Sequence, residues 1–96
     1  MGAVEKQRTS LYVGGKEYVV VSADSRQYLQ RVAAYADRAL RETALATRLP
    51  PVQVGALTAI NLSDELLKAQ DENTRLRREN RELHQKLEQL QGGEDA

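Results

Sequence analysis

The side chains that could carry out chemistry are few in this chain, and they are scattered. His84 is the one histidine among 96 residues, and there is no cysteine. A single imidazole without a thiol or a second histidine does not make a metal site. Ser63 is followed by the carboxylates Asp64 and Glu65, but no base accompanies them that would activate the hydroxyl. The sequence therefore predicts a protein that is not an enzyme and uses no metal or cofactor.

The glycine pair Gly14-Gly15 resembles a phosphate loop only superficially. It lacks the longer glycine spacing and the Lys-Ser or Lys-Thr that would follow. Side chains alternate on either side of it over residues 7–21, and both glycines can adopt positive φ. These features predict a β-hairpin with a two-residue turn. A lone hairpin is unstable in water, so it must pack on a helix or on a second chain.

A first helix is predicted from about residue 24 to residue 46. Asp24 with Gln27 three positions later forms a capping-box pattern, and Ser25 is an alternative cap. Tyr28 and Tyr35 flank the apolar stripe of this helix. Two interpretations are open for them: amphipathic side chains at the margin of a core, or a platform for a ligand. The stripe itself has three- and four-residue spacing and comprises Leu29, Val32, Ala33, Ala36, Ala39 and Leu40.

A second, longer helix is predicted after Pro50, because Pro51 can occupy the first turn of a helix but not its interior. Along it, two series of mostly apolar residues recur every seven positions. One series, which we assign to heptad position a, is Ala59, Leu66, Asn73, Asn80 and Leu87. The other, position d, is Leu62, Ala69, Leu76, Leu83 and Leu90. Such a seam predicts a coiled coil rather than a surface helix, whose apolar stripe would be wider.

The seam also indicates its partner. Asparagine at position a costs stability but pairs well with a second asparagine in an in-register parallel dimer. Glu72 and Glu79 at position g face Arg77 and His84 at position e of a partner helix. The residues predicted to hold the chains together are Leu62, Leu66, Asn73, Leu76, Asn80, Leu83, Leu87 and Leu90.

Composition limits the head of the molecule to a small core. The aromatic residues are four tyrosines, without tryptophan or phenylalanine. We expect an α+β, oligomeric protein with four parts: a disordered N-terminus (1–6), a globular head (7–66), a coiled-coil helix (67–91) and a disordered tail (92–96) that begins at a glycine stop.

A net charge of zero argues against binding to nucleic acid. No signal peptide or membrane span is recognisable, so we expect a cytoplasmic protein.

The order of these elements, and one stretch above all, resembles the ZapA family of bacterial cell-division proteins. Residues 57–66, LTAINLSDEL, are similar to the L-x-A-L-N-I-A-D-E-L that opens the second helix in that family. Ile60, Leu62 and Ser63 are conservative departures. The hairpin with Gly14 and residues 28–37 are also similar, and the likeness covers roughly residues 8–70.

The resemblance implies a protein that binds FtsZ, the tubulin-like GTPase of the division ring, and crosslinks and aligns its filaments. Dimers would form through the heads and the long helix and could pair into tetramers, at the division site and without a cofactor or small-molecule substrate. The basic head residues expected to meet FtsZ are Arg8, Lys16, Arg31, Arg38 and Arg41. A solvated charged face remains the other interpretation of the arginines. Two alternative functions also remain open: a coiled-coil structural adaptor, and a DNA-associated regulator.

Overall fold

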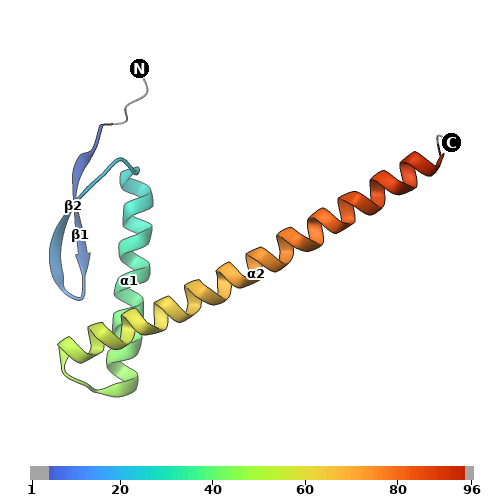
Figure 1. The fold of residues 1–96 in the computed structure, drawn as a ribbon. Coiled ribbons are helices and arrows are strands. Elements are labelled where there is room, and N and C mark those ends of the chain that lie inside the picture. The colour runs from blue at the N-terminus through green and yellow to red at the C-terminus, as the bar shows by residue number, and fades with distance from the viewer. Residues whose placement is uncertain (1–4, 95–96) are drawn as a thin grey trace. The chain divides into compact units, whose positions relative to one another are not determined.

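The computed structural model describes residues 5–94 of the chain. Four elements follow one another: strands β1 (Gln7–Val13) and β2 (Lys16–Ser22), then helices α1 (Arg26–Thr47) and α2 (Pro51–Glu94) (Figure 1). The prediction of an α+β protein with a hairpin and two helices, the second of them long, is confirmed.

Two compact units divide the chain. The first, Met1–Ile60, contains the hairpin, α1 and the first turns of α2, and the second, Asn61–Ala96, contains the rest of α2. Within the described residues, neither helix has an apolar stretch of the length that a membrane span requires. Residues 1–4 and 95–96, which belong to the termini predicted to be disordered, lie outside the described residues.

The hairpin has the register that the alternating side chains predict. Strands β1 and β2 are antiparallel, with Leu11 opposite Tyr18 and Val13 opposite Lys16. Gly14 and Gly15 form the turn with φ angles of 63° and 79°, the left-handed region that a two-residue hairpin turn needs. The same face of both strands therefore presents its apolar side chains toward α1.

The core of the first unit is small. Four apolar side chains are buried in the part of the chain that the structure describes: Leu11, Leu29, Ala33 and Val54. Val13 and Val20 pack against the first three of these. The buried hydroxyl of Thr58 donates to the carbonyl oxygen of Val54 at 2.7 Å and so costs little. A core of this size provides little stability to a chain on its own.

Helix α1 begins at the alternative cap rather than at the predicted capping box. The Tyr28 N–H donates to Ser25 Oγ at 3.1 Å, which makes Ser25 the N-cap. The box of Asp24 and Gln27 was therefore the wrong choice. Asp24 is held instead by Ser22, whose hydroxyl donates to Asp24 Oδ2 at 3.2 Å and accepts from the Asp24 N–H at 3.0 Å.

The ends of the helices agree only in part with the prediction. Arg48 closes α1 in a left-handed conformation with φ of 57°, and α2 begins at Pro51, as predicted. The predicted glycine stop was wrong, because α2 continues through Gly92 to Glu94. A glycine inside a helix costs only about 1 kcal/mol relative to alanine, and Gly92 does not adopt the positive φ that would turn the chain away.

Candidate interaction surfaces

No catalytic or metal constellation emerges from the side chains that the structure describes. They contain no group of three or more histidine, cysteine or acidic residues close enough to hold a metal ion. Three surfaces remain that could contact another macromolecule. They are an apolar groove in the first unit, the charged face of α1, and the heptad positions of α2.

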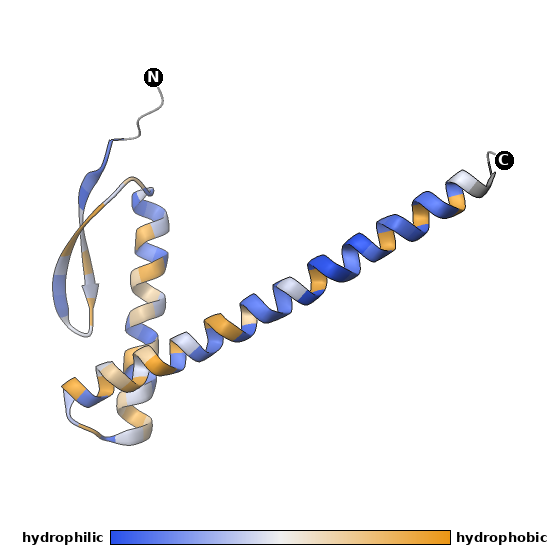
Figure 2. Ribbon diagram, viewed as in Figure 1, coloured by the Kyte–Doolittle hydropathy of each residue, from blue (hydrophilic) through white to orange (hydrophobic). Residues whose placement is uncertain are grey.

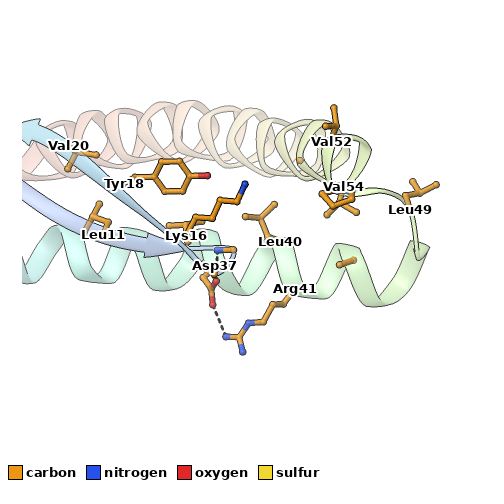
Figure 3. A pocket seen from close by; sticks show the side chains of 16 residues that line it. Leu11, Lys16, Tyr18, Val20, Asp37, Leu40, Arg41, Leu49, Val52 and Val54 are labelled. Atoms are coloured by element: carbon orange, nitrogen blue, oxygen red, sulfur yellow. Dashed lines mark hydrogen bonds and ion pairs between the residues drawn. The ribbon is translucent and has the colours of Figure 1, made fainter.

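The groove is lined by the hairpin, the second half of α1 and the first turns of α2, and its volume is about 840 Å³ (Figure 3). Leu40 extends into it from α1 and Val54 from α2, while Tyr18 of β2 lines the hairpin side. Lys16, Asp37 and Arg41 supply the charged part of the lining. Because apolar side chains dominate, the groove fits an apolar segment better than a charged one.

Asp37 fastens the hairpin turn to α1. The Gly14 N–H donates to Asp37 Oδ1 at 2.8 Å, and the other carboxylate oxygen pairs with Arg41 at 3.0 Å (Figure 3). A Cβ at Gly14 would lie 3.5 Å from the Leu40 side chain, so a side chain at this turn position would be in van der Waals contact with the helix. This contact joins residues 23 positions apart in sequence and fixes one wall of the groove.

The predicted seam residues all lie on α2. Seven of the eight are exposed in the single chain, and Leu62 is half-buried. Leu76, for example, is 49% exposed and Leu83 59%. Figure 2 shows apolar positions recurring along the helix among hydrophilic ones. Leucines so exposed and so regularly spaced form a surface that a second helix could cover.

Both acidic residues predicted to bridge two chains, Glu72 and Glu79, are engaged within their own helix. Arg75 Nε donates to Glu72 Oε2 at 2.9 Å, and another nitrogen of the same guanidinium contacts Glu79 at 2.5 Å. The hydrogen bond from Arg75 lowers the pKa of Glu72, and the same bond raises the pKa of Arg75. A pairing of Glu72 with Arg77 of another chain would have to compete with this local contact.

The five basic residues predicted to meet FtsZ do not form one patch. Arg31 and Arg38 are seven residues apart on α1 and so share a helix face, and Lys16 and Arg41 line the groove. Arg8 lies on β1 five residues before the end of the strand, which puts it roughly 17 Å from the turn. Two of the five already have acidic neighbours, since Arg38 pairs with Glu42 and Arg41 with Asp37, each at 3.0 Å.

Two features were not predicted from the sequence. The groove needs segments from four elements, and no local pattern shows which faces will meet. On the outer face of the hairpin, Ser10 Oγ and Tyr12 OH donate to Glu17 at 3.1 and 3.0 Å. The hydrogen bond to Glu17 raises the pKa of Tyr12 above its ordinary value. The alternation of the strands, together with their register, would have placed these three side chains on one face.

Comparisons with known proteins agree on one family. The family described as "Cell division protein ZapA" matches residues 9–92. A protein of that description from Halalkalibacterium halodurans is 37% identical over 68 residues, which is 70% of this chain and 75% of the relative. One from Geobacillus thermodenitrificans is 33% identical over 93 residues, which is 94% of this chain and 92% of the relative.

A solved structure is similar over most of the chain as well. It is the "ZapA mutant dimer from Geobacillus stearothermophilus", with a TM-score of 0.68 and 31% identity, covering 82% of this chain and 93% of the other.

Fold and surfaces together define a class of protein: a small α+β head on a heptad-bearing helix, with apolar surface left open for another chain. The chain belongs to the ZapA family of cell division proteins.

Proposed function

We propose that this chain is a non-enzymatic protein of bacterial cell division that binds FtsZ and crosslinks its filaments, in the cytoplasm at the division site. The observation that carries the proposal is the family match over residues 9–92, which includes nearly all of the described chain. FtsZ as the partner follows from the resemblance of residues 57–66 to the family.

Self-association is part of the proposal. The similar protein from Geobacillus stearothermophilus is described as a dimer, and this chain has the small core and exposed leucine seam that a dimer would cover. Two chains joined by their long helices carry two heads. Two heads on neighbouring filaments gain avidity from effective concentration, so each head needs only a weak contact. Pairing of two dimers into a tetramer would add a second pair of heads.

The FtsZ contact is assigned to the basic side chains of the head. Arg31 and Arg38 are the strongest candidates, because both are exposed and share one face of α1. Arginine forks bind carboxylates in two-point geometry, which suits an acidic partner surface. Lys16 and Arg41 form a second basic group at the groove, and Arg8 a third on β1. The proposal therefore places FtsZ binding along α1 first and on the hairpin second.

The test is co-sedimentation with FtsZ assembled with GTP, at low and at high salt. We expect the protein to pellet with FtsZ and to increase the amount of polymer in the pellet. Loss of both effects at high salt would support a contact made by exposed charges, since salt screens these. Absence of enrichment at either salt would refute FtsZ binding and favour a coiled-coil adaptor with another partner.

A further inference from the structure

Two tyrosines of α1 have no role in the surfaces described so far. Tyr28 is 49% exposed and Tyr35 61%, and Val32 between them is 43% exposed. At 3.6 residues per turn, these three positions fall within about 60° of one another around the helix. We call them the tyrosine face. Large apolar side chains that lie together in solvent form a surface suited to contact with another molecule.

The tyrosine face is separate from both the core of the head and the apolar groove. Leu29 and Ala33, the buried residues through which α1 packs on the hairpin, lie roughly 110° further round the helix (Figure 1). No residue of the tyrosine face lines the groove. Of the two interpretations open for the tyrosines, a platform for a ligand therefore fits their placement better than the margin of a core.

Two arginines border the tyrosine face on one side. Arg31 follows Tyr28 by three residues, and Arg38 follows Tyr35 by three, so each arginine lies next to a tyrosine on the helix surface. Tyrosine and arginine are the residue types enriched at the positions that dominate the binding energy of protein interfaces. A tyrosine ring also supplies a large contact area at a low cost in side-chain entropy. The face thus has an aromatic centre and a basic rim.

The chemistry of the face specifies its partner. Aromatic rings in the centre are best covered by apolar side chains, and the arginines at the rim are complementary to carboxylates. The pair of Arg38 with Glu42 does not prevent this, because the two side chains are 78% and 67% exposed and such pairs contribute little. The matching surface is therefore an apolar patch with acidic residues along one side, rather than a surface that is acidic throughout.

We propose that the tyrosine face is the centre of the contact with FtsZ, where its rings pack on apolar side chains of FtsZ while Arg31 and Arg38 bind carboxylates beside them. The inference rests on the proposed function and adds Tyr28, Val32 and Tyr35 to the basic residues assigned there. It has a consequence for salt dependence. Salt screens the arginines but not the packing of the rings, so binding weakens at high salt without disappearing.

Three full-length variants test the inference. Tyr35→Ser removes the ring, and Tyr35→Phe keeps the ring but removes the hydroxyl. Tyr12→Ser is the matched control, because Tyr12 is 66% exposed but lies on the hairpin, outside the tyrosine face. Each variant is titrated against FtsZ assembled with GTP at low and at high salt, and the concentration that half-saturates the pelleted polymer is measured. Light scattering gives the mass of each variant alone.

We expect Tyr35→Ser to raise the half-saturating concentration roughly 10-fold at both salt concentrations, as the loss of an aromatic side chain from the centre of an interface does. Tyr35→Phe and Tyr12→Ser should stay within about 2-fold of the natural protein. The mass in light scattering should be the same for all of them, because the proposed contact is with FtsZ and not with a second copy of the chain.

If the natural protein pellets with FtsZ and Tyr35→Ser pellets equally well, the inference is overturned while the proposed function stands. If the natural protein does not pellet at either salt, the proposed function fails and the inference fails with it. Four other results also overturn the inference: complete loss of binding at high salt, a loss for Tyr35→Phe as large as for Tyr35→Ser, an equal loss for Tyr12→Ser, or a lower mass of Tyr35→Ser. They would assign the contact to charges, to the hydroxyl, to the hairpin or to self-association, respectively.

Discussion

Removal of the Asp37 carboxylate should detach the hairpin turn from α1. In Asp37→Ala the Gly14 N–H loses its acceptor at 2.8 Å, and Arg41 loses its ion pair at 3.0 Å. A hydrogen bond to a charged group contributes about 1.5–3 kcal/mol, and the lower end applies because the Asp37 side chain is 26% exposed. The pair with Arg41, itself 72% exposed, adds about 0.5 kcal/mol at most. We expect a loss of about 2 kcal/mol.

In a domain of this size, a loss of about 2 kcal/mol lowers the Tm by roughly 8–16 °C. The assay is thermal unfolding followed by circular dichroism at one fixed chain concentration, because dimerisation makes the Tm depend on concentration. Glu42→Ala is the matched control: it removes the Arg38–Glu42 pair, also at 3.0 Å and also four residues apart on α1, without touching the hairpin. Equal Tm values for Asp37→Ala and Glu42→Ala would refute the anchoring role. Asp37→Asn, which keeps an acceptor but not the charge, should fall between the two.

Three further outcomes are expected. Leu83→Glu places a charge in the seam and should weaken association of the chains by about 100-fold or more. The mass in light scattering then falls toward that of one chain, whereas the outward-facing control Gln85→Glu leaves the mass unchanged. Arg38→Glu reverses a charge on the proposed FtsZ surface and should reduce co-sedimentation about 2- to 5-fold at low salt, and unchanged binding would remove this residue from the surface. Glu17→Gln removes the charged acceptor of Tyr12, so the pKa of Tyr12 should fall back toward 10.0 in an ultraviolet titration. Because the pKa of Tyr12 is raised in the folded chain, its hydrogen bond to Glu17 stabilises the hairpin below pH 10.0, and this stabilisation is lost as the pH rises through the raised pKa. Identical titrations of the two proteins would contradict this account.

The elements of the fold could be predicted because each is encoded locally. The glycine pair predicts its own turn, since both residues must take positive φ, and the turn then sets the register of Leu11 against Tyr18. Pro51 marks the start of α2 in the same way. The cap of α1 is less certain from sequence, because Asp24 and Ser25 both satisfy the local pattern. The hydrogen bonds of Asp24 with Ser22 decide between them.

The candidate surfaces were predictable only where they lie on a single helix. The heptad seam needs nothing but spacing along α2, and the ion pair of Asp37 with Arg41 needs nothing but a separation of four. The groove and the bond from Gly14 to Asp37 depend on how separate elements pack, which no pattern within one element encodes. The basic residues show the same limit: charge is readable from the sequence, but Arg8 and Lys16 lie at opposite ends of the hairpin.

The predicted seam of α2 combines leucines with two asparagines, and this combination could specify both a partner and a register. Leucines alone would tolerate slippage of one helix along the other, so we expect the polar residues Asn73 and Asn80 to fix the register. The leucines would then supply affinity and the asparagines orientation, and a parallel dimer of this kind would carry both heads at the same end of the pair.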